Sequence, residues 1–430
     1  MTAIVGILNK RGAVMAADSA VTVTNGGKTK IYNTATKIFR LSLENPVGVM
    51  IFSSSEFMGT PWDVIFKLYR DTKGKQSFYK LKEYAQSFMA FLKAENYFSS
   101  IKSQRDYFIS ELSNFYYTIK DEILEQYQAR TAGLSDEEAA DIDSDAIIHE
   151  LLEAELKRVS KMYEEQGVNP EFEDYTMDNM RSYGHDLFDD LMDLCKEDQL
   201  PTDMRELWES CFHTYICSLH YYKGTGIVLV GYGNQDIYPS LLPIYISGAF
   251  DHRMRYYLDE ESAEVITNDN SSSICPFAQK DVMMTLMKGC APDFFDKLDS
   301  VYDESVTAIR QKIKEEMKNA GASEEMLSKI DEIDLSDQKD NFGKSLSDYM
   351  QEEYVEGIIE AVESFNIEDM ANMAESLIAV TNLQRHISSS DESVGGPIDV
   401  AVITRSEGFV WVKHKEWFRQ DLNPHTKVYE

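Results

Sequence analysis

The chain opens with two apolar runs, Thr2-Ala3-Ile4-Val5-Gly6-Ile7 and Gly12-Ala13-Val14-Met15-Ala16-Ala17-Asp18-Ser19. The residues between them, Lys10–Gly12, have the composition of a tight turn. This pattern predicts a β-hairpin with strands at Ala3–Leu8 and Ala13–Ala17. The second strand ends at Asp18, a polar residue at the edge of an apolar segment.

Further strand patterns follow the hairpin and return near the other end of the chain. A short strand at Val21–Thr24 is closed by the turn signal Asn25-Gly26-Gly27. The other predicted strands are short apolar runs bounded by turns, at Lys37–Leu41, Val47–Ser53, Gly226–Tyr232, Leu242–Ala249, Ile398–Thr404 and Phe409–Lys413. We expect these strands to belong to one domain with helices inserted between them.

Two long acidic segments between the strands predict helices. Residues 61–222 carry apolar side chains at helical spacing, such as Phe88, Phe91 and Leu92, and residues 292–365 have a similar pattern. Strands and helices do not alternate one by one along the chain. The predicted fold class is therefore α+β with large helical insertions, and not a parallel βαβ array.

The composition is that of a globular protein with a strong negative charge. The 430 residues are 43% apolar and carry a formal net charge of −32, which argues against nucleic acid as a partner because phosphate binding needs clustered Lys and Arg. No apolar run approaches the roughly 18 residues that cross a bilayer, and the start lacks a signal-peptide pattern. Five cysteines without a CxxC pair indicate reduced thiols. We predict a cytoplasmic protein with no membrane partner, metal or cofactor.

Thr2 has a chemical property that depends on its place in the chain. Because threonine is small, removal of Met1 is expected, and it leaves Thr2 with a free α-amine beside its hydroxyl. The hydroxyl is a nucleophile, and the amine, with a reference pKa of about 7.7–8.0, is a general base close to operating pH. An N-terminal threonine activated by its own amine is a known form of nucleophilic catalysis.

The opening runs, together with Thr36-Lys37-Ile38-Phe39-Arg40-Leu41, resemble the beginning of proteasome β-subunits and their bacterial relatives. The resemblance implies an N-terminal-nucleophile (Ntn) hydrolase with a four-layer αββα sandwich. The implied Ntn core is discontinuous and comprises residues 2–60, 223–291 and 366–418. Residues 61–222 then hold core helices with a long acidic insertion, and residues 292–365 form a second insertion.

Position by position, the resemblance assigns catalytic roles to Thr2, Asp18 and Lys37. Thr2 is the nucleophile, Lys37 favours ionisation of its hydroxyl, and Asp18 keeps the lysine charged and oriented. Lys28 and Lys30 compete for the lysine role, but neither is followed by the Ile-Phe-Arg-Leu pattern. A surface Asp–Lys pair worth less than about 1 kcal/mol is the alternative to a catalytic pair.

The strand ending at Ser53 resembles the family segment that enters a glycine-rich turn, where a backbone N–H serves as the oxyanion hole. Ser53 occupies the matching position, which is usually glycine in the family. This segment and the short strand after Ser19 are implied to bind a peptide by β-augmentation. The implied substrate-binding residues are Val21, Thr22, Val23, Ile51 and Ser55.

Two later segments continue the resemblance. Residues 273–289 resemble the start of the third family helix, with Cys275-Pro276-Phe277 in place of the family's Ser-Gly-Ser. Asp391-Glu392-Ser393-Val394-Gly395-Gly396 resembles the pattern Asp-x-x-Ser-Gly-Gly. The resemblance therefore implies that Asp391 orients the amine of the nucleophile, with Ser393 and Gly395 in support. A turn-forming aspartate before Gly-Gly is the alternative for Asp391.

These observations predict a threonine peptidase or amide hydrolase that acts on peptides or unfolded protein. The resemblance further implies a homo-oligomer, built as a ring or a stacked assembly, with an unfoldase or regulatory protein as a possible partner. Two alternatives stay open, namely a non-catalytic structural or regulatory subunit and an amidase for a small molecule. Retention of Met1 would exclude the N-terminal-nucleophile mechanism.

Overall fold

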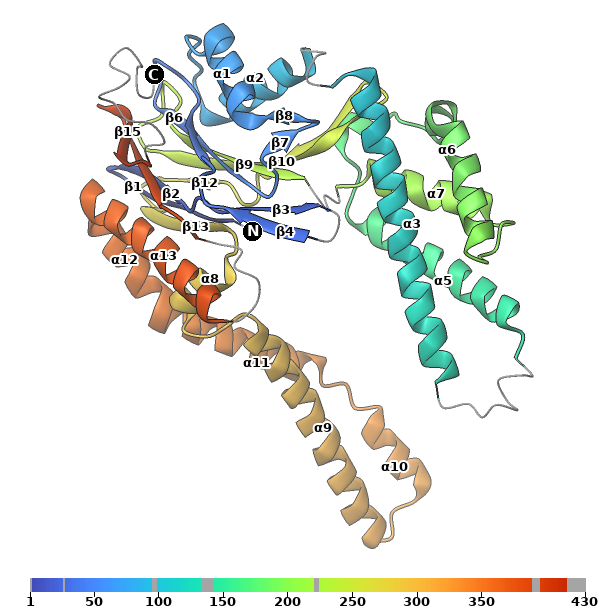
Figure 1. Ribbon diagram of the computed structural model, residues 1–430. Coiled ribbons are helices and arrows are strands. Elements are labelled where there is room, and N and C mark those ends of the chain that lie inside the picture. Colours follow the sequence, from blue (N-terminus) through green and yellow to red (C-terminus); the bar gives the residue numbers. More distant parts are fainter. Residues whose placement is uncertain are drawn as a thin grey trace. The chain divides into compact units, whose positions relative to one another are not determined.

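The computed structural model describes residues 2–25, 28–94, 99–132, 142–219, 224–388 and 395–415, without the side chains of residues 22–25, 28, 29 and 296. Within these ranges the chain combines helices with antiparallel strands, which confirms the predicted mixture (Figure 1). The chain divides into two compact units. The first unit comprises Met1–Phe52, Val230–Leu241 and Glu264–Glu430, and the second comprises Ser53–Leu229 and Leu242–Ala263.

A five-stranded antiparallel sheet is the centre of the first unit. Its order is β13-β1-β2-β14-β15, so the opening hairpin lies between strands from the second half of the chain. The strands are β1 (Ala3–Asn9), β2 (Gly12–Ala17), β13 (Ser272–Ala278), β14 (Asp399–Thr404) and β15 (Gly408–Lys413). Ile4 lies opposite Ala17 and Asn9 opposite Gly12, which confirms the predicted hairpin.

Helices cover one face of this sheet. In Figure 1, α12 (Glu356–Ser364) and α13 (Ile367–Ile387), drawn in orange and red, lie along the sheet, and α8 (Asp281–Lys288) contacts α13. Side chains alternate between the two faces of a strand, so every second residue of β1 and β2 points to these helices. The buried apolar side chains between sheet and helices include Ala3, Val5, Ile7, Val14, Ala16, Met370, Ala374, Ile378, Val400 and Val402.

The other face of the sheet is covered by an antiparallel pair, β5 (Ile38–Arg40) and β6 (Val47–Phe52). The approach is close at Gly48 in β6, where a Cβ atom would lie 2.5 Å from Met15 Cε and 3.0 Å from Ile403 Cδ1. Since real side chains do not approach so closely, a larger residue at this position would displace the Met15 side chain. The first unit thus has a helix layer, the five-stranded sheet and a further strand layer.

Other elements of the first unit extend from these layers. β3 (Val21–Asn25) and β4 (Lys28–Tyr32) form a two-stranded sheet shortly after Asp18. The short strand β12 (Glu264–Val265) pairs with residues 240 and 241. The second predicted helical block is confirmed as α9 (Asp293–Asn319), α10 (Glu324–Asp331), α11 (Ser336–Met350) and a π-helical turn, η2 (Gln351–Val355), which leads into α12.

The second unit is mainly helical, which confirms the first predicted helical block. Its helices are α1 (Trp62–Lys73), α2 (Leu81–Ala94), α3 (Ile101–Thr131), α5 (Ser144–Glu165), η1 (Pro170–Phe172), α6 (Met177–Glu197) and α7 (Arg205–Cys217). Ser100, Asp143 and Thr176 cap α3, α5 and α6 by accepting a hydrogen bond from the N–H three residues later. The core is rich in aromatic residues, including Phe108, Phe115, Trp208, Phe212 and Phe250.

The second unit also contains short strands. These are β7 (Glu56–Phe57), β8 (Thr60–Pro61) and β11 (Arg253–Leu258), whereas β9 (Thr225–Gly231) and β10 (Ser240–Phe250) are each divided between the two units along the chain. β10 and β11 pair as an antiparallel hairpin. β9 and β10 confirm the predicted central strands, whereas β4, β11 and β12 are not predicted by the sequence pattern.

Residues 273–289 contain a helix start, as the resemblance implies, since α8 begins at Asp281. The chain first forms β13, which the sequence pattern does not predict. Pro276 is compatible with this strand, because proline is tolerated in an edge strand and β13 is the first strand in the sheet order. The predicted division into a discontinuous core and two insertions stays a prediction.

Candidate active site

The carboxylate of Asp18 is completely buried and has four hydrogen-bond donors around it. Its Oδ1 accepts hydrogen bonds from the Ala3 N–H at 2.9 Å and from Lys37 Nζ at 2.6 Å. Its Oδ2 accepts from the Ala20 N–H at 3.1 Å and the Gly395 N–H at 3.3 Å. Asp18 therefore connects the start of β1, the segment after β2, the residue before β5 and the segment before β14.

Lys37 forms a buried ion pair with Asp18. The side chains are 4% and 0% exposed, so the alternative of a surface Asp–Lys pair is wrong. The Ile51 N–H donates to the Lys37 carbonyl at 2.9 Å, which fixes the backbone of Lys37 beside β6. Burial lowers the pKa of Lys37 below its usual value, and the hydrogen-bonded ion pair with Asp18 offsets only part of this effect.

The two competing lysines lie in β4. The ammonium of Lys30 is 4.9 Å from the centre of the Tyr32 ring, and its side chain is exposed. The side chain of Lys28 lies outside the described residues. Lys37 is thus the candidate lysine that the structure pairs with Asp18.

Thr2 lies directly before β1 and is 7% exposed. Both polar groups of the peptide bond that joins Thr2 to Ala3 are held. The Thr2 carbonyl accepts from the Gln279 N–H at 3.2 Å, and the Ala3 N–H donates to Asp18. Thr2, the predicted nucleophile, is therefore directly followed by Ala3, whose N–H binds the buried Asp18 carboxylate.

The segment before β14 contacts the segment after β2. The Ser19 N–H donates to the Gly395 carbonyl at 3.1 Å, and the Ser19 hydroxyl donates to the Pro397 carbonyl at 2.6 Å. Gly395, one of the predicted supporting residues, is thereby held against Asp18. Met1, Asp391 and Ser393 lie outside the described residues, and the roles assigned to Asp391 and Ser393 stay predictions.

Ser53 is the first residue of the second unit and is exposed. Its φ of 71° lies in the left-handed region, which costs a non-glycine residue about 1–2 kcal/mol. This conformation explains why glycine is usual where the resemblance places Ser53. Ser55 is exposed, and its carbonyl accepts from the Trp62 N–H at 3.1 Å. Ile51 is 4% exposed, and its N–H is already engaged by Lys37.

β3 holds the remaining predicted substrate-binding residues. Val21 is half-buried, and the side chains of Thr22 and Val23 lie outside the described part of the chain. Val21 lies opposite Tyr32 in β4 and Val23 opposite Lys30. Because β4 occupies one edge of β3, a peptide added to β3 needs the other edge.

A second buried polar cluster, which the sequence pattern does not predict, lies at the start of β14. Asp399 is 1% exposed, and its Oδ1 lies 3.0 Å from His414 Nδ1 and accepts from the Lys415 N–H at 2.9 Å. Its Oδ2 accepts from Lys415 Nζ. Burial alone raises the pKa of Asp399, but the hydrogen bonds from His414 and Lys415 outweigh it and hold this pKa below the usual value. The sequence feature that could have indicated this cluster is the lone aspartate within the apolar run Ile398–Ile403.

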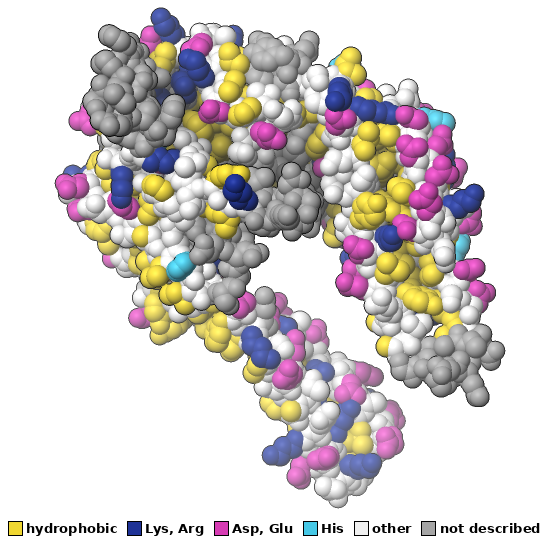
Figure 2. Space-filling model, viewed as in Figure 1, with side chains coloured by type: hydrophobic (Ala, Val, Ile, Leu, Met, Phe, Trp, Pro, Cys, Tyr) yellow, Lys and Arg dark blue, Asp and Glu magenta, His cyan; other side chains and the backbone are white. Residues whose placement is uncertain are grey.

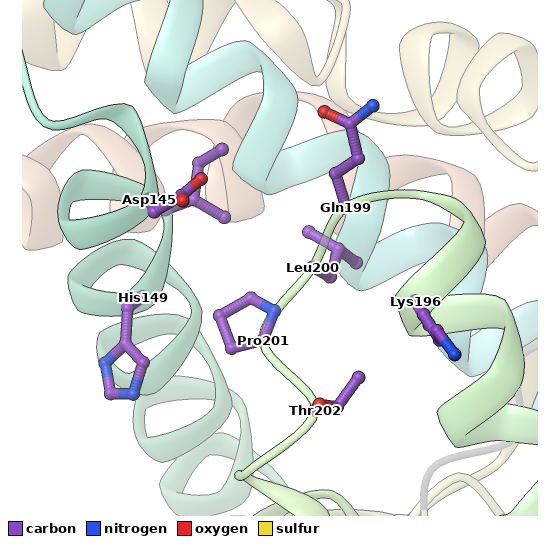
Figure 3. Close-up of a pocket in the computed structure, with 8 residues that line it drawn as sticks. Asp145, His149, Lys196, Gln199, Leu200, Pro201 and Thr202 are labelled. Atoms are coloured by element: carbon purple, nitrogen blue, oxygen red, sulfur yellow. The ribbon is translucent and has the colours of Figure 1, made fainter.

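A pocket of about 520 Å³ in the second unit is a separate candidate. Figure 3 shows Asp145 and His149 lining it from α5, with Lys196 from α6 and the loop Gln199–Thr202 that follows α6. His149, one of the lining residues, lies 3.4 Å from Asp203, and both side chains are exposed. We assign no chemistry to this pocket, because an exposed pair of this kind is common on protein surfaces.

Charged side chains are spread over the surface. On the face shown in Figure 2, Asp and Glu are interspersed with Lys and Arg instead of forming one patch. Across the described ranges, no helix has both the length and the apolarity needed to cross a membrane. Within the same ranges, His, Cys, Asp and Glu form no group of three or more that is arranged to hold a metal ion.

Comparison with known proteins gives no family assignment, since neither a protein-family model nor a curated protein matches the chain.

Proposed function

We propose that the chain is a threonine hydrolase of the proteasome type, in which Thr2 is the nucleophile after removal of Met1. The observation that carries the proposal is the buried Asp18–Lys37 pair, whose carboxylate also binds the Ala3 N–H next to Thr2. A buried ion pair contributes little net stability compared with apolar side chains of similar size. Its position beside residue 2 therefore favours a chemical role over a purely structural one.

In the proposed reaction, the Thr2 hydroxyl attacks the carbonyl carbon of an amide, and its proton passes to the Thr2 α-amine. The Lys37 ammonium stabilises the developing negative charge, and Asp18 holds that ammonium in place. The resemblance supplies the oxyanion donor, the Ser53 N–H, and the residue that orients the amine, Asp391. The amine then protonates the leaving group, and water hydrolyses the resulting ester to restore Thr2.

The proposal includes the fold and the assembly that the resemblance implies. The helix layer, the five-stranded sheet and the β5–β6 layer of the first unit support an αββα sandwich, which has four layers in all. Members of the family form rings or stacks, so we propose a homo-oligomer in the cytoplasm. Its substrates are peptides or unfolded protein, delivered with the help of an unfoldase or regulatory partner.

The first test is the intact mass of the purified full-length protein, which shows whether Met1 has been removed. The second is covalent labelling by a peptide epoxyketone, an electrophile that reacts with the hydroxyl and the α-amine of an N-terminal threonine. We expect one label per chain, located at Thr2, with loss of labelling in Thr2→Ala and retention in Thr2→Ser. Thr202→Ala, at an exposed threonine in the second unit, is the matched control and keeps full labelling.

Each of the other possible results supports a different conclusion about the function of the chain. Retained Met1, or equal labelling of Thr2→Ala, overturns the mechanism. Removal of Met1 with neither labelling nor peptide hydrolysis identifies a non-catalytic subunit. Hydrolysis of small amides without hydrolysis of peptides identifies a small-molecule amidase.

A further inference from the structure

The carboxylate of Asp399 is the second buried acid in the first unit, and its position in the sheet places it beside the candidate site. In the pairing of β14 with β2, Asp399 lies opposite Ala17, the residue directly before Asp18. Ala17 also lies opposite Ile4 in β1, two residues after Thr2. Residues directly opposite each other in antiparallel strands direct their side chains to the same face. Asp399, Ala17 and Ile4 therefore share one face of the five-stranded sheet.

That face is the one covered by β5 and β6. The helix-covered face is formed by Ala3, Val5, Ala16 and Val400, each of which is adjacent in sequence to one of the three residues above. Because side chains alternate along a strand, Asp399 points away from those helices. Asp399 therefore points toward the layer that β5 and β6 form. Lys37, the partner of Asp18, directly precedes β5 in that layer.

The partner of Asp399 is a second lysine, Lys415, whose burial is intermediate. Lys415 Nζ donates to Asp399 Oδ2, and the two side chains are 11% and 1% exposed. The Lys37 pKa responds first to burial, which lowers it, and then to Asp18, which raises it. Beyond these effects, Lys415 lowers the Lys37 pKa and Asp399 raises it, so the two members of the second pair act on Lys37 in opposite directions.

We propose that Asp399 and Lys415 are positioning residues for the candidate active site, and that by neutralising each other they leave Asp18 to set the charge of Lys37. The pair places a negative and a positive group on the face of the sheet that β5 and β6 cover, and their effects on Lys37 have opposite signs. Lys37 then depends on Asp18 for its ionisation. The catalytic meaning of this arrangement rests on the proposed function, whereas the charge coupling itself does not.

Single removal of either partner has an effect of opposite sign on Lys37. In Asp399→Asn, the Lys415 ammonium stays without its counter-charge, and the Lys37 pKa falls. In Lys415→Met, the Asp399 carboxylate loses its lysine counter-charge and keeps only the hydrogen bond with His414, and the Lys37 pKa rises. The sign of each shift follows from the charge that remains near Lys37. The double variant Asp399→Asn/Lys415→Met removes both charges and returns the Lys37 pKa close to that of the unmodified protein.

The test is a pH titration of the full-length protein labelled with 13C at the lysine ε-carbon, followed by NMR. The Lys37 resonance is identified by its absence in Lys37→Arg. Lys413→Met is the matched control, because Lys413 is two residues from Lys415 but is 52% exposed and paired with Glu375. We expect a downward shift in Asp399→Asn, an upward shift in Lys415→Met, and none in Lys413→Met.

Shifts of the same sign in both single variants, or no shift in either, overturn the proposal. If Asp399→Asn fails to fold, Lys415→Met and the double variant still give the sign and its reversal. The pH profile of epoxyketone labelling at Thr2 is then measured in the same proteins. If the Lys37 pKa shifts as expected but Thr2 is not labelled, the proposed function is rejected and the charge coupling stands. If Thr2 is labelled but the Lys37 pKa is the same in all variants, the charge coupling is rejected and the proposed function stands.

Discussion

Lys37 Nζ lies 2.6 Å from Asp18 Oδ1, and neither side chain is solvated. Each charge therefore depends on the other for compensation, since a lone buried charge is costly. The same carboxylate binds three backbone N–H groups, at Ala3, Ala20 and Gly395. A change at Asp18 thus affects the ion pair and the local backbone together. The free energy of unfolding of Asp18 variants therefore reports on the candidate site.

Asp18→Asn is expected to lower the free energy of unfolding by about 3–5 kcal/mol, because it leaves the Lys37 ammonium buried and unpaired. Asp18→Asn/Lys37→Met removes both charges and recovers a large part of that loss. Urea unfolding of the three proteins measures both values. Glu260→Gln is the control, since the Lys82–Glu260 pair is exposed and its loss costs less than about 1 kcal/mol. A double variant less stable than Asp18→Asn contradicts this account.

The lowered pKa of Lys37 predicts a specific dependence of stability on pH. Between the lowered folded-state pKa and the unfolded value of 10.5, the unfolded chain binds a proton that the folded chain lacks. The free energy of unfolding contributed by Lys37 therefore rises with pH across this window. Lys37→Met lacks this contribution, so the stability difference between the two proteins should grow in favour of the unmodified protein from neutral pH toward the unfolded value. A constant difference across the window contradicts a lowered Lys37 pKa.

Ser53→Gly is expected to raise stability by about 0.5–1 kcal/mol, because glycine adopts the left-handed conformation at Ser53 without steric cost. The backbone N–H proposed for the oxyanion is kept, so labelling of Thr2 should continue at an undiminished rate. Ser55→Gly is the matched control. It lies two residues away without a positive φ, and glycine there lowers stability by about 0.5–1 kcal/mol. Equal effects of the two changes would show that the conformation of Ser53 is not strained.

Substitutions at Gly396 and Gly408 can be compared to test how closely the segment beside Asp18 is packed. Their φ angles are 79° and 74°, but a Cβ atom on Gly396 would lie 2.8 Å from Asn33 Cβ, whereas one on Gly408 meets nothing within 4 Å. Gly408→Ala should cost about 1 kcal/mol from backbone strain alone. Gly396→Ala should cost about 2–4 kcal/mol and slow the labelling of Thr2, because the clash displaces the neighbouring Gly395. Similar losses in thermal unfolding would argue against this close contact.

Local pattern was sufficient for the opening hairpin, because its two apolar strands and the turn between them are encoded within 19 residues. The choice of Lys37 over Lys28 and Lys30 came from the resemblance, since only Lys37 is followed by the Ile-Phe-Arg-Leu run. The structure pairs that lysine with Asp18. The two helical blocks were also predictable, since helical spacing repeats over many turns.

Contacts between residues far apart in the sequence could not be predicted from local pattern. β13 was not predicted as a strand, because its identity as a strand depends on β1, more than 260 residues earlier in the sequence. Asp399 was overlooked because an aspartate in an apolar strand has no meaning until His414 and Lys415 are known to reach it. A single sequence does not reveal such partners, since neither spacing nor periodicity records them.

The hydrogen bond from the Gly395 N–H to Asp18 spans 377 positions along the chain. During synthesis at roughly 5–20 residues per second, the opening hairpin waits roughly 20–75 s before that donor is made. Contacts of such long range also slow folding, because the loop between them must close first. The hydrogen bonds around the residue next to Thr2 are thus completed only after the segment that holds Gly395 has emerged, so the proposed site forms late in synthesis.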